Sequence, residues 1–259
     1  MSVSAEVLKP QSGIKTSKVP EVTFIFWVIK ILCTTLGETA GDAVTMSMNL
    51  GYLIGTLIFA TIFITAVLIQ VYAKRFHPII YWVTIISTTT VGTTMADYAD
   101  RSLGVGYLGG SLSLLGLLLA SLGVWYGSQG SVSVNTVSTP KVEAFYWLTI
   151  MFSQTLGTAL GDWTADSAGM GYDGAAIIFS GLLMLVAACY FWTRLSRTLL
   201  FWSAFILTRP LGAVIGDFLD KPIAHGGLNL SRYSASAALI VLVLAFILFF
   251  PQRAAQQEH

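Results

Sequence analysis

The sequence predicts an all-α polytopic membrane protein, with eight transmembrane helices arranged as four parallel two-helix repeats. Of its 259 residues, 55% are apolar and only 10% are Asp, Glu, Lys or Arg, whereas soluble domains carry about 25% charged residues. Apolar stretches of membrane-spanning length recur along the whole chain, and one short motif occurs four times. The composition excludes a soluble domain, and a net charge of +1 excludes a basic surface for nucleic acid.

The apolar stretches define the helices, because about twenty residues are needed to cross the hydrocarbon core of a bilayer. We expect spans at 22–45, 52–73, 79–100, 107–126, 143–166, 174–193, 199–219 and 233–250. The chain then divides into an N-terminal tail (1–20), a first half of two repeats (21–126), a linker (127–141), a second half of two repeats (142–250) and a C-terminal tail (251–259). The linker is rich in Gly, Ser and Thr, which predicts flexibility.

The distribution of Lys and Arg predicts the orientation, because cytoplasmic loops are enriched in these residues. The termini and loops on one side carry Lys9, Lys15, Lys18, Lys74, Arg75, Lys141, Arg194, Arg197 and Arg253. The opposite side carries only Arg101, Lys221 and Arg232. This asymmetry places both termini in the cytoplasm.

Each repeat contains a tryptophan, a glycine ten residues later, an aspartate five residues after that, and a second glycine nine residues beyond the aspartate. The four copies are Trp27, Gly37, Asp42 and Gly51; Trp82, Gly92, Asp97 and Gly106; Trp147, Gly157, Asp162 and Gly171; and Trp202, Gly212, Asp217 and Gly226. Because every copy begins on the same side of the membrane, the repeats are parallel and not inverted.

Most positions of the motif have a structural interpretation. An aromatic residue precedes each tryptophan, which is typical of an interfacial belt. The first glycine and the small residue before the aspartate form small-xxx-small spacings, which favour close helix packing. The second glycine predicts a turn into the next helix.

The acidic residues are harder to explain by folding alone, because a carboxylate near a helix C-terminus opposes the helix dipole. If the odd-numbered helices form an inner bundle, the motif aspartates converge at one level around its axis, but no spacing in the sequence fixes the order of the helices. The predicted metal-ligating residues are Glu38, Asp42, Asp97, Asp100, Asp162, Asp166 and Asp217, with supporting charge from Arg209 and Lys221. Such an oxygen site suits Mn²⁺, Mg²⁺ or Ca²⁺. The same acids could instead relay protons, or terminate helices and pair with Arg101, Arg209 and Lys221.

Two segments, KVPEVTFIFWVIKILCTTLGET at the first helix and TRPLGAVIGDFLDKP at the seventh, resemble a family of uncharacterised bacterial multi-span integral membrane (membrane-anchored) proteins. The resemblance extends from Lys18 to Phe250 and implies the bacterial inner (plasma) membrane, without implying an activity. A weaker likeness, in residue types only, links Gly37-Glu38 and Gly41-Asp42 to the acid-and-glycine motifs of manganese and calcium exporters.

The sequence therefore predicts a secondary transporter for a divalent cation, not an enzyme, because no nucleophile–base set, CxxC pair or phosphate loop is present. The expected partners are the lipid bilayer and a metal ion or proton, without a nucleic acid, and the only expected cofactor is a divalent metal ion. Two alternatives remain open. One is a non-transporting scaffold or sensor whose acids form helix-end and salt-bridge contacts, and the other is a proton-coupled carrier of a small organic solute.

Overall fold

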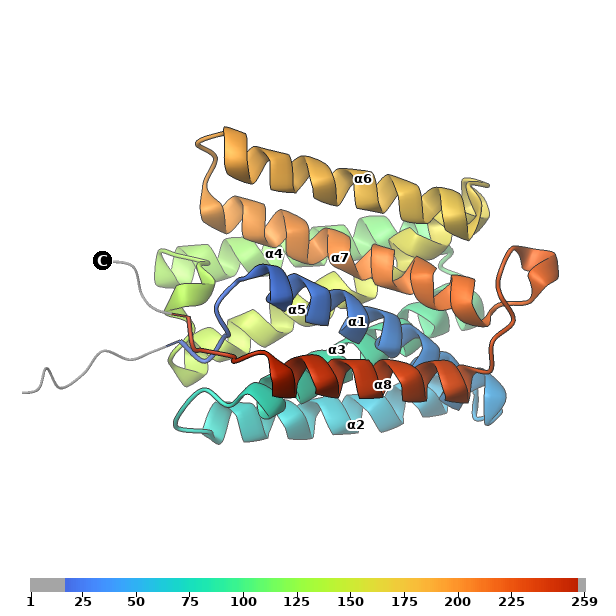
Figure 1. Cartoon of the computed structure of the whole chain (residues 1–259), viewed down its shortest axis with the longest axis horizontal. Helices are drawn as coiled ribbons and strands as arrows, with labels where there is room; N and C mark the ends of the chain where they lie inside the picture. The colour runs from blue at the N-terminus through green and yellow to red at the C-terminus, as the bar shows by residue number, and fades with distance from the viewer. Residues whose placement is uncertain (1–16, 256–259) are drawn as a thin grey trace, which may run out of the picture.

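The computed structural model describes residues 17–255, and within this range the regular elements are helices apart from one antiparallel bridge between Pro20 and Ala254. Four inner helices carry the repeated motif, and four outer helices surround them (Figure 1). The inner helices are α1 (Phe24–Asp42), α3 (Pro78–Asp97), α5 (Pro140–Asp162) and α7 (Arg197–Asp220). The outer helices are α2 (Gly51–Tyr72), α4 (Tyr107–Gln129), α6 (Gly171–Trp192) and α8 (Arg232–Phe249).

The repeats close into a ring. The inner helices contact one another in the order α1, α3, α5, α7, and α7 packs back against α1. Each outer helix packs against the inner helix of the following repeat: α2 on α3, α4 on α5, α6 on α7, and α8 on α1. The last helix of the chain therefore completes the environment of the first, and the odd-numbered helices form the inner bundle.

The prediction of eight spans needs a correction. In the described part of the chain, seven helices are long and apolar enough to cross a membrane, and α5 is the helix that falls short. It packs between α3 and α7 and under α4, and it buries polar side chains between them. These residues are Thr149, Ser153, Gln154, Thr155 and Thr158. These polar side chains lower the hydropathy of α5.

The outer helices expose the apolar surface. In the apolar 18-residue stretch of α2 or α6, only 11% is buried, whereas the corresponding share in α3 or α7 is 72%. Leucine and isoleucine side chains such as Leu57 and Ile177 remain 60% and 72% exposed. An apolar outer surface of this extent indicates a membrane protein, because hydrocarbon, unlike water, does not penalise it.

The two kinds of motif glycine behave as predicted. The second glycine adopts a positive φ in every repeat, with values of 76° at Gly51 and Gly106, 68° at Gly171 and 84° at Gly226, a region that favours residues without a Cβ. The first glycine receives a side chain from the next inner helix in the ring. The contacts are Gly37 with Thr89, Gly92 with Gln154, Gly157 with Arg209, and Gly212 with Thr34. Small residues therefore set the spacing of the inner ring.

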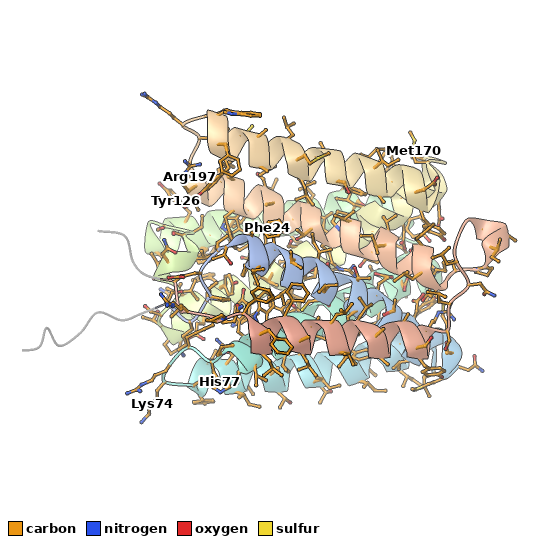
Figure 2. The ribbon with its side chains drawn as sticks, in the orientation of Figure 1. Phe24, Lys74, His77, Tyr126, Met170 and Arg197 are labelled. Carbon is orange, nitrogen blue, oxygen red and sulfur yellow. The ribbon has the colours of Figure 1, made fainter. Side chains whose placement is uncertain are left out.

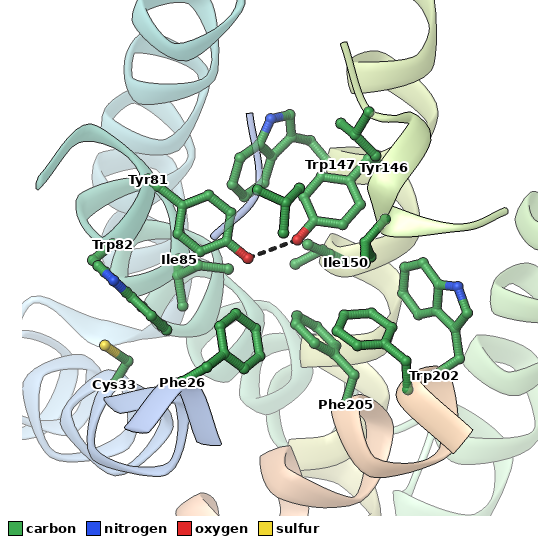
Figure 3. Packing of buried hydrophobic residues seen from close by; sticks show 14 of the residues in the cluster. Phe26, Cys33, Tyr81, Trp82, Ile85, Tyr146, Trp147, Ile150, Trp202 and Phe205 are labelled. Atoms are coloured by element: carbon green, nitrogen blue, oxygen red, sulfur yellow. Dashed lines mark hydrogen bonds between the residues drawn. The ribbon is translucent and has the colours of Figure 1, made fainter. Parts of the chain in front are cut away.

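The predicted interfacial belt is wrong for the aromatic pairs. Most of their rings lie inside the bundle, where they form a plug across the end at which the inner helices begin (Figure 3). Tyr81 and Trp82 are fully buried, and the Tyr81 and Tyr146 hydroxyls form a 2.7 Å hydrogen bond. Four repeats bring eight such rings to one level, where edge-to-face contacts, as between Tyr146 and Trp147, fill the axis.

The linker is ordered and does not behave as a flexible connection. Its Val134 and Val137 are buried, and its Val132 carbonyl accepts a hydrogen bond from the Trp202 indole. Residues 17–20 and 251–255 lie beside it and exchange backbone hydrogen bonds, among them Lys18 N to Val137 O at 2.8 Å. Together these three segments form a cap on the aromatic end. Residues 1–16 and 256–259 of the predicted tails lie outside the described residues.

Lys74, His77, Tyr126 and Arg197 lie at the same end of the bundle as the cap, whereas Met170 lies at the opposite end (Figure 2). Lys18 crosses the cap and forms a buried ion pair with Glu143, at 2.6 Å. The ammonium of Lys18 also donates to the carbonyl of Val71 at 2.9 Å. The N-terminal segment is thereby fastened to both α2 and α5.

Candidate functional site

The four motif aspartates lie at the end of the bundle opposite the cap. Asp42, Asp97 and Asp162 are each the last α-helical residue before a π-helical turn, and Asp217 lies in the last turn of α7. The π-helical turns are Ala43–Ser47, Tyr98–Ser102 and Trp163–Ser167. All four aspartates are between 0% and 4% exposed. Single π-helical turns are rare and often occur at functional sites.

The carboxylates converge in two triads. In the first triad, oxygen atoms of Glu38, Asp42 and Asp97 all lie within 4.8 Å of one another. In the second triad, Asp42, Asp217 and Asp220 meet the same criterion. Asp42 therefore belongs to both triads and links α1 to its two neighbours in the ring, α3 and α7.

Asp162 joins the cluster through Arg101. The guanidinium of Arg101 lies 2.9 Å from Asp97 through Nε and 3.2 Å from Asp162 through Nη2. Arg101 is 29% exposed, so it covers these two carboxylates from the outer side. All four motif aspartates thus belong to one continuous network of charges, which the sequence alone could not establish.

Lys221 and Arg232 cover the second triad. The Lys221 ammonium contacts Asp42 and lies 3.0 Å from Asp217, and Arg232 Nε lies 3.0 Å from Asp220. Burial lowers the pKa of Lys221, but the carboxylates of Asp217, Asp42 and Asp220 outweigh burial and raise the pKa above its ordinary value. The ammonium is therefore charged at neutral pH.

A polar column continues from the acids toward the centre of the bundle. Arg209 is fully buried and donates through Nη2 to Glu38 at 3.0 Å, Thr93 at 2.6 Å and Thr158 at 2.5 Å. One level deeper, the buried Lys30 Nζ atom has no hydrogen-bond partner and lies 4.3 Å from the centroid of the Phe205 ring. The aromatic plug closes the axis beyond Lys30.

The structure separates the predicted site residues into two groups. Glu38, Asp42, Asp97, Asp162 and Asp217 come together, as do the supporting Arg209 and Lys221. Asp100 and Asp166 belong to neither triad. The Asp100 carboxylate faces Gly110 of α4, and Asp166 is exposed in its π-helical turn. The structure does not bring these two carboxylates to the others, whereas Asp162, which is also outside both triads, is connected through Arg101.

Three charged residues outside the predicted set belong to the site, and one of them, Arg101, is expected from the sequence only as a helix-end pairing partner. Asp220 completes the second triad, Arg101 bridges two aspartates, and Arg232 pairs with Asp220 from the start of α8. Asp220 stands three residues after Asp217 on α7, a spacing that places side chains on one helix face. Arg101 lies in the π-helical turn after Asp97 and contacts it with a longer side chain. Arg232 gave no comparable signal, because its proximity depends on how α8 packs.

Three carboxylates within 4.8 Å of one another need nearby positive charge, because like charges in a buried site cannot all ionise unaided. Arg209, Lys221 and Arg101 each pair with one of these carboxylates. The Asp42 Oδ1 atom is buried and has no hydrogen-bond partner. Carboxylate and hydroxyl oxygens are ligands for hard cations such as Mg²⁺, Ca²⁺ and Mn²⁺. The candidate triads contain neither a histidine nor a cysteine, and this donor set disfavours softer metals.

The fold and the buried acid cluster define an all-helical protein of four hairpin repeats. A family model described as "Repeat of Unknown Function (DUF347)" matches the chain four times, at residues 25–76, 80–131, 145–196 and 200–254. The chain therefore belongs to the DUF347 repeat family, and each match contains one inner helix and the outer helix that follows it. No curated protein and no solved structure matches the chain.

Proposed function

We propose that this protein is a secondary transporter for a divalent cation, with Mn²⁺ as the first candidate, in the bacterial inner membrane with both termini in the cytoplasm. The observation that carries the proposal is the first triad, in which Glu38, Asp42 and Asp97 bring buried oxygen atoms within 4.8 Å of one another. An intramembrane carboxylate is costly and is usually retained for function. Here three of them share one site.

The arrangement of charge along the axis defines where a transported cation would stop in this state. A cation that enters from the acid end passes the covering cations, reaches the first triad, and meets Arg209 and Lys30 beyond it. The buried Arg209 guanidinium opposes its further movement, and Lys30 and the aromatic plug fill the axis beneath it. In this proposal the described structure is therefore a state closed at the cap end, and transport requires that end to open.

The ion pairs favour a second candidate, a non-transporting scaffold or sensor. Arg101 joins α3 to α5, and Lys221 joins α7 to α1, so the same charges could serve only to hold the ring closed. The two candidates differ in what neutralisation does. In a scaffold, loss of a carboxylate lowers stability without changing cation binding, whereas in a transporter it removes cation binding.

Flux into proteoliposomes tests the proposal. The purified protein is reconstituted, and Mn²⁺ entry is followed by the quenching of a trapped fluorophore, for the wild type and for Asp42→Asn. The shared carboxylate of both triads is altered in this variant, so we expect its flux to fall to the level of empty liposomes. Asp166→Asn is the matched control, because Asp166 is exposed and outside both triads. Equal flux in the wild type and Asp42→Asn would contradict the proposal.

A further inference from the structure

Lys221 occupies the position that a cation would take in the second triad. It directly follows the last residue of α7, and its side chain is 12% exposed. Its ammonium contacts Asp42 and lies 3.0 Å from Asp217 and 3.9 Å from Asp220. The carboxylates of the second triad therefore already surround one positive charge, which is covalently part of the chain.

The first triad holds no such charge at its centre. Arg209 pairs with Glu38 from the inner side, and Arg101 pairs with Asp97 from the outer side. The two carboxylate oxygens of Asp42 differ in their contacts. Oδ2 contacts Lys221, whereas the buried Oδ1 has no hydrogen-bond partner. The free oxygen belongs to the carboxylate that both triads share, so a cation at the first triad and the ammonium at the second would use the same aspartate.

We propose that Lys221 is a tethered competitor of the transported cation. Its ammonium repels a cation bound to Glu38, Asp42 and Asp97, and draws on the Asp42 carboxylate that the cation requires. When the cation binds, Lys221 shifts toward Asp217 and Asp220; when the cation leaves, Lys221 returns to Asp42. A transported ion must be bound strongly enough to enter and weakly enough to leave, and Lys221 supplies the weakening. This inference rests on the proposed transport function.

Binding of Mn²⁺ to the purified protein, measured by isothermal titration calorimetry, tests the role of Lys221. We expect Lys221→Met to lower the Kd by about tenfold or more, which corresponds to about 1.4 kcal/mol per factor of ten. Lys221→Arg keeps the charge and should stay within a few-fold of the wild type. Lys74→Met is the matched control, because Lys74 is exposed at the opposite end of the bundle.

A second variant keeps the test valid if Lys221→Met alone does not fold. Lys221→Met with Asp217→Asn removes one charge of each sign and leaves the first triad intact, so it should also bind Mn²⁺ more tightly than the wild type. If the wild type binds Mn²⁺ and Lys221→Met and the double variant bind equally or more weakly, Lys221 is not a competitor, while the transport proposal stands. If only Lys221→Met and the double variant bind, Lys221 excludes the cation from the wild type, and both the transport proposal and the role of Lys221 as a competitor of a transported cation fail. If no protein binds Mn²⁺, both proposals fail.

Discussion

The two ends of the inner bundle are built from the same four helices and serve opposite physical purposes. At the cap end, aromatic rings fill the axis, and the linker and the described ends of the chain fasten the helices together. At the acid end, carboxylates that repel one another are held close by Arg101, Lys221, Arg209 and Arg232. The comparison shows that one repeat can place stabilising aromatic packing at one end of an inner helix and mutually repelling carboxylates at the other end.

The largest effect is expected from the buried ion pair of the cap. Lys18→Met leaves Glu143 buried without its cation, and such a change typically costs about 3–5 kcal/mol. Thermal unfolding of the detergent-solubilised protein would measure the loss. Lys18→Met with Glu143→Gln removes both charges and should recover most of the stability. If Lys18→Met were as stable as the wild type, the Lys18–Glu143 ion pair would not stabilise the cap end of the bundle.

A smaller loss is expected where the inner helices touch. A Cβ on Gly212 would lie 2.5 Å from the Thr34 Cβ and 2.9 Å from the Thr34 backbone carbon. Gly212→Ala should therefore separate α7 from α1 and cost about 1–3 kcal/mol through overpacking. Gly116→Ala, on α4 with open space around it, is the control and should not lower the melting temperature. If both variants melted alike, the glycines would not set the spacing of the ring.

The hydrogen bond inside the aromatic plug should have a modest effect that stays at its own end. Tyr81→Phe removes the 2.7 Å bond to Tyr146 and should lower stability by about 0.5–1.5 kcal/mol. Cation binding at the acid end should not change, and calorimetry with Mn²⁺ would establish this. Loss of Mn²⁺ binding in Tyr81→Phe would show that the cap end and the acid end are energetically coupled, which contradicts this account.

The smallest effect on stability is expected at the acid end. Asp97→Asn removes one repelling carboxylate, and Arg101 keeps its partner Asp162, so the melting temperature without cation should change little. The rise in melting temperature with added Mn²⁺, which reports a ligand that binds only the folded state, should disappear. Asp166→Asn should keep that rise. Large destabilisation of Asp97→Asn together with an unchanged response to Mn²⁺ would favour the scaffold.

Much of the fold could be predicted because it depends on local sequence. The apolar stretches gave the helices to within a few residues, and the glycine nine residues after each aspartate marked a turn that needs a positive φ. The order of helices in the ring could not be predicted, because it depends on contacts such as Gly92 with Gln154 between separate repeats. The inward direction of the aromatic pairs depends on the same ring order.

In the candidate site, residue spacing alone does not predict which acidic side chains lie together. Asp166 stands four residues after Asp162, which on an α-helix would place both on one face. The chain instead forms a π-helical turn after Asp162, and Asp166 ends exposed. Asp220 remains on the α-helical face of Asp217 because α7 continues without such a turn. The local hydrogen-bonding pattern, which the sequence does not reveal, decides which second carboxylate joins the cluster.

The central claim is that the acid end holds a cation between Glu38, Asp42 and Asp97. Crystals of the protein grown with Mn²⁺, with diffraction recorded near the manganese absorption edge, test it most directly. The account predicts an anomalous peak within coordination distance of these three carboxylates, and its absence from Asp42→Asn crystals grown in the same way. Wild-type crystals without a peak there, or with manganese bound only elsewhere, would contradict the account.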